Sequence, residues 1–225
     1  MSSQMSEVLW GRLLTHLCVL LLAVSLHAEI IDRIAVSVGN RVITTSELNL
    51  QIRVAAFLNG AKPDFTPAAR RAMAQRMVEQ TLIRQALESN SYPLPASSEV
   101  DPALQAFRGR FHPDPAEFAR ALAGAGITEQ DLRSELLWQR TLTQFVDMRF
   151  RPGLQVTDAE IQQYFDQVVA PLAKAAHPGQ PVNLDDYRSD IETKLTGDRA
   201  DQEMDKWLQE ARTRTEVVFH EEVFQ

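Results

Sequence analysis

The sequence predicts a mainly α-helical protein with a small antiparallel β-sheet. From Ser46 to Thr213, most of the chain shows apolar residues at helical spacing behind helix-start signals. Apolar residues alternate around Gly39-Asn40, a pair suited to a two-residue hairpin turn. The last β-like stretch is Thr215–Phe224. Because an isolated hairpin is marginally stable, we expect this stretch to supply a third strand, so that the two chain ends meet.

Residues 1–28 have the pattern of a secretory signal peptide, in which Arg12 precedes the apolar run Leu13–Val24. A small residue, Ala28, follows at the position expected for cleavage. The run is shorter than the roughly 20 residues that span a bilayer. We therefore expect cleavage after Ala28 and export to the periplasm, with an uncleaved membrane anchor as the alternative.

Composition limits the chemistry of the exported protein. The chain has 225 residues, a formal net charge of −7 and one cysteine, Cys18, inside the predicted signal. Cleavage would remove Glu7 and Arg12 together, which leaves the net charge unchanged, and would leave no thiol for disulfides. The only basic cluster beyond the signal is Arg70-Arg71, so nucleic acid is not expected as a partner.

The predicted hairpin leads directly into the first helix. One side of the first strand carries the apolar residues, and Arg33 and Ser37 lie on the other; the apolar residues are Ile30, Ile34, Val36 and Val38. Arg41, Val42 and Ile43 form the returning strand. Thr44 and Glu47 have the spacing of a capping box, which places a helix start between them.

Capping residues and apolar periodicity predict the remaining helices. The expected helices are Ser46–Leu58, Pro67–Ser89, Ser98–Phe111, a short one opened by Asp114-Pro115, one from Thr128 to about Phe150, one opened by Thr157 and Glu160, and a last one from about Leu184. The proline-containing stretch 170–183 is expected to be a linker. Gly197, inside the last helix, would kink it or weaken it by about 1 kcal/mol.

Three motifs of the chain resemble those of one protein family. The first is the stretch from Asp32 to Leu48, DRIAVSVGNRVITTSEL. It is similar to the hairpin and helix that open the mature proteins of the SurA-type periplasmic chaperones and their PpiC and PrsA-like relatives. Val156–Phe165, VTDAEIQQYF, resembles a second family helix, and Lys206–Arg212, KWLQEAR, resembles the closing helix before the last strand. The resemblance covers nearly all of the chain after the signal, in order.

The resemblance implies a domain organisation with one large departure. It implies a SurA N-terminal-like helical chaperone domain at 29–169, completed by a C-terminal helix and strand at 184–225. In the family a parvulin prolyl-isomerase domain normally follows the second motif, whereas here only 170–183 stands in that place. Segments of fewer than about 40 residues rarely fold alone. We therefore expect no isomerase activity.

No motif in the sequence indicates an enzyme or a metal site. His112, His177 and His220 lack the spacing of converging metal ligands, and no nucleophile elbow or phosphate-binding loop is present. We therefore expect no enzyme activity, cofactor or metal. Aromatic residues in the middle of the chain are candidates for contacts with unfolded clients: Phe107, Phe111, Phe118 and Trp138. The alternative is that these rings belong to the core, because large aromatics dominate cores.

By family implication, the protein is expected to be a periplasmic, ATP-independent holdase that binds unfolded polypeptides, outer-membrane proteins among them. A holdase binds the unfolded state and so lowers the concentration that is free to aggregate. The alternative is an interaction or assembly subunit that holds one defined partner of the cell envelope. Exchange of the C-terminal helix between two chains would give a homodimer, and the sequence leaves this arrangement open.

Overall fold

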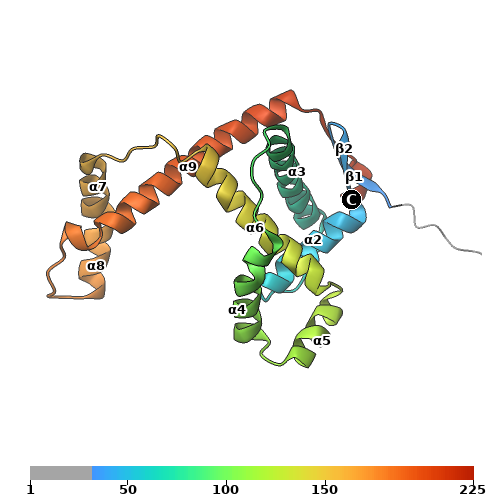
Figure 1. The fold of residues 1–225 in the computed structure, drawn as a ribbon, viewed down its shortest axis with the longest axis horizontal. Helices are drawn as coiled ribbons and strands as arrows, with labels where there is room; N and C mark the ends of the chain where they lie inside the picture. The colour runs from blue at the N-terminus through green and yellow to red at the C-terminus, as the bar shows by residue number, and fades with distance from the viewer. Residues whose placement is uncertain (1–31) are drawn as a thin grey trace, which may run out of the picture. The chain divides into compact units, whose positions relative to one another are not determined.

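The computed structural model describes residues 32–225, whose fold is shown in Figure 1. The predicted signal segment 1–28, its cleavage position Ala28 and the strand residue Ile30 lie outside the described residues. The α-helices of the described part are α2 (Thr45–Leu58), α3 (Pro67–Ser89), α4 (Asp101–Phe111), α5 (Pro115–Ala125), α6 (Glu129–Arg149), α7 (Asp158–Tyr164), α8 (Ala170–Ala176) and α9 (Arg188–Arg214).

The predicted mainly α-helical fold with a small antiparallel sheet is confirmed. Strands β1 (Ile34–Val38), β2 (Arg41–Thr44) and β3 (Val217–Phe219) form an antiparallel sheet in the order β2-β1-β3. The C-terminal strand therefore pairs with the hairpin as expected. Beside the ladder, the backbone N–H of Gly39 donates to the carbonyl of Glu216 at 2.8 Å. The turn uses a positive φ of 57° at Gly39, which glycine adopts without steric cost.

A β-bulge changes which side chains of β1 are buried, relative to the prediction. The register shifts between Ile34 and Val36, and as a result Ala35 and Val36 are both buried while Ile34 is exposed. The expectation that Ile34 shares the buried side of Val36 and Val38 was wrong, because the extra residue of a bulge breaks the strict alternation of side chains. The β-like stretch at the C-terminus is also shorter than predicted, and its end forms the 3₁₀ turn Glu221–Val223.

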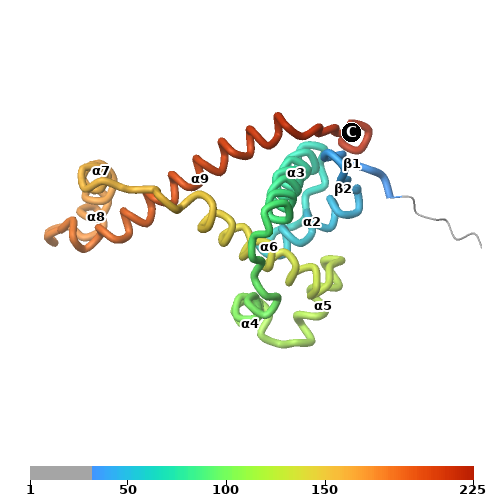
Figure 2. The backbone as a smooth tube through the Cα atoms, turned by 45° about the horizontal axis from the view of Figure 1, so that its top comes forward, coloured from blue at the N-terminus to red at the C-terminus, as the bar shows by residue number. Residues whose placement is uncertain are grey.

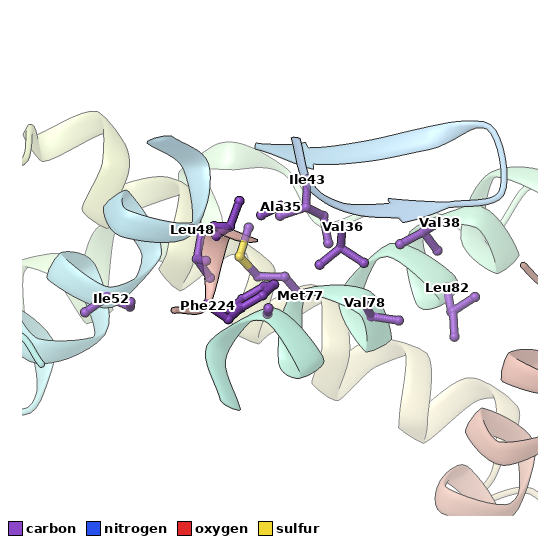
Figure 3. Packing of buried hydrophobic residues seen from close by; sticks show 12 residues of the cluster. Ala35, Val36, Val38, Ile43, Leu48, Ile52, Met77, Val78, Leu82 and Phe224 are labelled. Carbon is purple, nitrogen blue, oxygen red and sulfur yellow. The ribbon is translucent and has the colours of Figure 1, made fainter. Parts of the chain in front are cut away.

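The sheet, α2 and α3 enclose one hydrophobic core. Helices α2 and α3 run next to each other and both contact the hairpin (Figure 2). In Figure 3, Val36 and Val38 of β1 point toward Met77 and Val78 of α3. Phe224, from the far end of the chain, packs into the same cluster. This burial is what ties the C-terminus to the N-terminal hairpin.

Helix α6 connects two further clusters of buried residues. Its first half packs with α2, α4 and α5 around Leu132 and Phe118. Its second half packs with α3 and α9 around Trp138 and Phe145. Helix α9 contacts α3, α6 and α7 of its own chain (Figure 1). Exchange of α9 between two chains stays a prediction.

The expected linker is shorter than predicted. A π-helical turn, η2 (Phe165–Val169), joins α7 to α8 with helical backbone angles throughout, so Ala170–Ala176 is helix. The prediction treated Pro171 as a helix breaker, because proline lacks an N–H and its ring clashes with the carbonyl four residues earlier. The π turn directly before Pro171 locally changes the i→i−4 pattern and accommodates it. Only the stretch 177–183 then separates α8 from the 3₁₀ turn η3 (Leu184–Asp186).

Gly197 lies inside α9, which continues unbroken from Arg188 to Arg214. The helix is therefore not broken at this glycine, and the kink and the weakening both stay predictions. None of the helices in residues 32–225 is both long and apolar enough to cross a membrane.

Candidate functional site

Three of the four aromatic candidates lie in one cluster near α4. Phe107 and Phe111 have ring centroids 5.1 Å apart, and Phe57 of α2 lies 5.7 Å from Phe107. The ring of His112 lies 5.9 Å from that of Phe118. Phe107 and Phe111 lie one helical turn apart on α4, and Phe118 lies at the start of α5. Both helices pack these rings against the end of α2.

Most of this aromatic cluster belongs to the core. Phe118 is only 2% exposed, whereas Phe111 is 54% exposed, and Phe107 is partly buried between them. Phe118 is therefore not available to a client in this conformation, and Phe111 is the one ring of the three that mainly faces solvent. The physical reason is that α5 packs its apolar side, with Phe118 and Leu122, against α2 and α6.

The fourth candidate, Trp138, lies apart from the others, at a cleft. It is buried in the cluster between α3, α6 and α9, and it is among the residues that line the cleft. The volume of this cleft is about 380 Å³. It is lined by Arg41, Arg84, Leu87, Glu88, Leu94, Pro95, Ser134, Leu137, Trp138 and Thr141.

A second cleft of about 290 Å³ adjoins the first and shares Arg41 and Arg84 with it. It lies between the outer strand β2, α2 and α3, and its apolar lining includes Val42, Leu50 and Met77. Val42 is half exposed. We refer to the two clefts together as the Arg84 groove. Its length is set by α3, which contributes residues from Met77 to Glu88.

The charged side chains of the groove differ in how they are paired. Arg41 forms an ion pair with Glu88. Glu47 is held in the capping box of α2, where its carboxylate accepts a hydrogen bond from the Thr44 backbone N–H at 2.8 Å. Within residues 32–225, the guanidinium of Arg84 forms no hydrogen bond and no ion pair, and it lies over the Trp138 ring at 4.4 Å from the centroid. Arg84 is thus the groove cation that no carboxylate neutralises directly.

The surroundings of Arg84 disfavour its charge. Crowding by protein atoms lowers the pKa of Arg84 below its usual value. The carboxylate of Glu135 raises this pKa, the like charge of Arg41 lowers it, and the carboxylate of Glu88 raises it to a smaller extent. An anion that entered the groove would offset the desolvation of this guanidinium.

The groove lining combines apolar side chains with polar and charged groups, a combination suited to ligand binding. The prediction had singled out Trp138 but missed Arg84, Leu94 and Leu137. Leu137 falls outside the apolar arc of its helix, and Leu94 stands between two prolines and is 65% exposed. For Leu137, the sequence signal is an apolar residue that lies outside the apolar face of its helix.

The described residues offer no arrangement for metal binding. Among residues 32–225, no group of three or more histidine, cysteine, aspartate and glutamate side chains is placed to hold a metal ion. His112 stacks on Phe57 at 5.5 Å, and the Nε2 atom of His220 lies 3.2 Å from the hydroxyl of Ser37. His112 and His220 thus lie in separate structural environments.

No protein-family model matches this chain, and comparison with curated proteins found no significant match. The resemblance to the SurA-type chaperones therefore rests on the three sequence motifs.

Proposed function

We propose that this protein is an ATP-independent holdase of the periplasm, which binds unfolded polypeptides, outer-membrane proteins among them, without catalysing prolyl isomerisation. The observation that supports this proposal is the Arg84 groove. Its lining includes the apolar residues Leu87, Leu94, Leu137 and Trp138, which the apolar side chains of an extended chain could contact.

An unfolded segment would be held through its apolar side chains. Each large apolar side chain removed from water contributes about 1.5–3 kcal/mol. A shallow groove binds a few such side chains at once, which gives binding that is reversible and tolerant of sequence. Because such binding draws on the unfolded population only, aggregation is slowed without an energy source.

The periplasmic location and the choice of clients have a different basis. The signal-peptide pattern of residues 1–28 supports export. The resemblance of the three motifs to SurA-type chaperones supports outer-membrane polypeptides as clients. The short connection 177–183 between α8 and η3 supports the proposed lack of an isomerase domain.

The proposal is tested with the mature protein, from Glu29 onward. A chemically unfolded client is diluted in the presence of a several-fold molar excess of the protein, and light scattering reports aggregation. The same samples are followed in a prolyl-isomerisation assay. We expect suppressed aggregation and an unchanged isomerisation rate. Unaltered aggregation would contradict the holdase proposal, and an accelerated isomerisation would contradict the proposed lack of catalysis.

Two exposed leucines provide a matched pair of variants. Leu94 lines the groove and is 65% exposed, and Leu172 of α8 is 67% exposed and lies outside the groove lining. Substitution of either by serine should change stability by less than about 0.5 kcal/mol, because both are surface positions. We expect Leu94→Ser to weaken client binding by about tenfold, or roughly 1.4 kcal/mol. Leu172→Ser should leave client binding unchanged.

The reverse result would favour the second candidate function, a subunit that holds one defined partner of the cell envelope. Exposed apolar side chains at Val168 and Leu172, beside each other on the helical segment η2–α8, favour such a contact. A pull-down that yields one stoichiometric partner, lost with Leu172→Ser and kept with Leu94→Ser, would support this candidate over the holdase.

A further inference from the structure

We propose that the Arg84 groove binds acidic–apolar peptide segments, in which a carboxylate contacts Arg84 while a neighbouring large apolar side chain contacts Leu94 and Trp138. This inference rests on the proposed peptide-binding function and specifies the chemistry of the ligand. Arg84 supplies the charge that is complementary to the carboxylate of such a segment.

The groove lining includes apolar side chains, and one of its charged side chains is a cation without an ion pair. Arg41 is paired with Glu88, and Glu47 is engaged by the cap of α2. Arg84 stands where the two clefts meet, and across the described chain its guanidinium has no ion pair. A carboxylate placed there would form charge-assisted hydrogen bonds, which are stronger than neutral ones.

The contact with Trp138 prepares Arg84 for such a ligand. The guanidinium lies over the ring, 4.4 Å from the centroid, so the ring restricts its position. The donors of a guanidinium lie in its plane, along the edges, and stay accessible when a face is covered. A bound carboxylate would contact these edges, while the apolar side chain beside it would contact Leu94 and Trp138.

The whole chain has a net charge of −7, so a general attraction for acidic peptides is not expected. A preference for a carboxylate must therefore come from a local contact. The preference for a carboxylate should therefore depend on one arginine, Arg84. Non-specific electrostatic binding would not depend on a single side chain.

The first experiment uses the wild-type mature protein and two short fluorescent peptides. Both contain an adjacent phenylalanine and leucine, and they differ only in a neighbouring glutamate or glutamine. Fluorescence anisotropy gives the two dissociation constants. We expect the glutamate peptide to bind about tenfold more tightly, since a hydrogen bond to a charged group contributes about 1.5–3 kcal/mol. Equal binding of both peptides would overturn the carboxylate inference and leave the holdase proposal standing. Failure of both peptides to bind would count against the holdase proposal itself.

The second experiment assigns the preference to Arg84. Arg84→Gln should bind both peptides as weakly as the wild type binds the glutamine peptide, and Arg84→Lys should keep part of the preference. Arg149→Gln is the matched control, because Arg149 also lies over a tryptophan, 5.4 Å from the Trp207 ring, and lies outside the groove lining. A full preference in Arg84→Gln would overturn the inference, and so would a loss of preference in Arg149→Gln. Circular dichroism verifies the fold of each variant.

Discussion

At the scale of single residues, Phe111 and Phe118 show how differently two phenylalanines of one aromatic cluster are placed. Phe118 is fully enclosed by α2, α5 and α6, whereas Phe111 is exposed at the end of α4. We expect Phe118→Ala to lower the free energy of unfolding by about 3–5 kcal/mol through the cavity it leaves. Phe111→Ala should cost less than about 1 kcal/mol. Urea unfolding of both variants checks this, and comparable losses would contradict the burial of Phe118.

Glu160 gives a pH-dependent prediction at the same scale. Hydrogen bonds from the Thr157 backbone N–H (2.9 Å) and hydroxyl (2.7 Å), followed by the charge of Arg199, hold the pKa of Glu160 below its ordinary value of 4.5. A depressed folded-state pKa contributes stability that is fully present above the unfolded-state value. This contribution is lost as the pH falls through the folded-state pKa.

We therefore expect wild type to be more stable than Glu160→Gln near pH 7, and the difference to shrink as the pH falls below about 4.5. Urea unfolding at a series of pH values measures it. A difference that is the same at neutral and acidic pH would show that the carboxylate charge does not stabilise the start of α7.

At the scale of elements, the helices begin where their caps place them. Thr44 with Glu47, Thr128 with Asp131, and Thr157 with Glu160 each form both hydrogen bonds of a capping box. Thr66 and Asp114 cap α3 and α5, each followed by proline in the first turn. These local signals explain why most helix starts were predicted within one residue.

A substitution at Gly197 tests how helix propensity affects the stability of α9. It lies in the interior of α9, and a Cβ atom built at this position meets nothing within 4 Å. We expect Gly197→Ala to raise the free energy of unfolding by about 0.5–1 kcal/mol, because alanine has the higher helix propensity and a less flexible unfolded chain. Thermal and urea unfolding measure the change. A loss of stability would mean that α9 needs the flexibility of glycine here.

At the scale of the whole molecule, α9 joins two separate clusters of buried residues. Its first half packs Ile191 with Ile161 and Phe165, and its second half packs Leu208 with Trp138 and Phe145. The Arg84 groove is lined by residues of the cluster around Leu208 and of the sheet region. No residue of the cluster around Ile191 lines it.

We expect Ile161→Ala to destabilise its own cluster by about 2–5 kcal/mol, because the side chain is fully buried. Amide hydrogen exchange should rise in α7, α8 and the first half of α9, with the sheet and α3 unchanged. Peptide binding in the groove should be retained. Weakened binding in this variant would show that the two clusters are coupled through α9.

The sequence predicted the fold further than it predicted the site. Hairpin, caps and the pairing of the C-terminal strand were read correctly, whereas the bulge at Ala35 and the helix across Pro171 were not. The bulge depends on how Ile34 and Val36 pair with β2, and the π turn on an irregular helical hydrogen-bond pattern, and neither has a clear local sequence signal.

What the sequence determined by itself is local: where the helices begin, where the hairpin turns, and which end stretches are β-like. Capping and turn formation involve residues within about four positions of each other, so their pattern is legible in the chain. The tertiary structure decided which aromatic rings are buried and which cationic side chain has no carboxylate partner in an ion pair. Phe118 and Phe111 share a type and a neighbourhood, and Arg84 meets Trp138 only because α3 and α6 pack together. Burial and pairing depend on such long-range contacts, which no local pattern specifies.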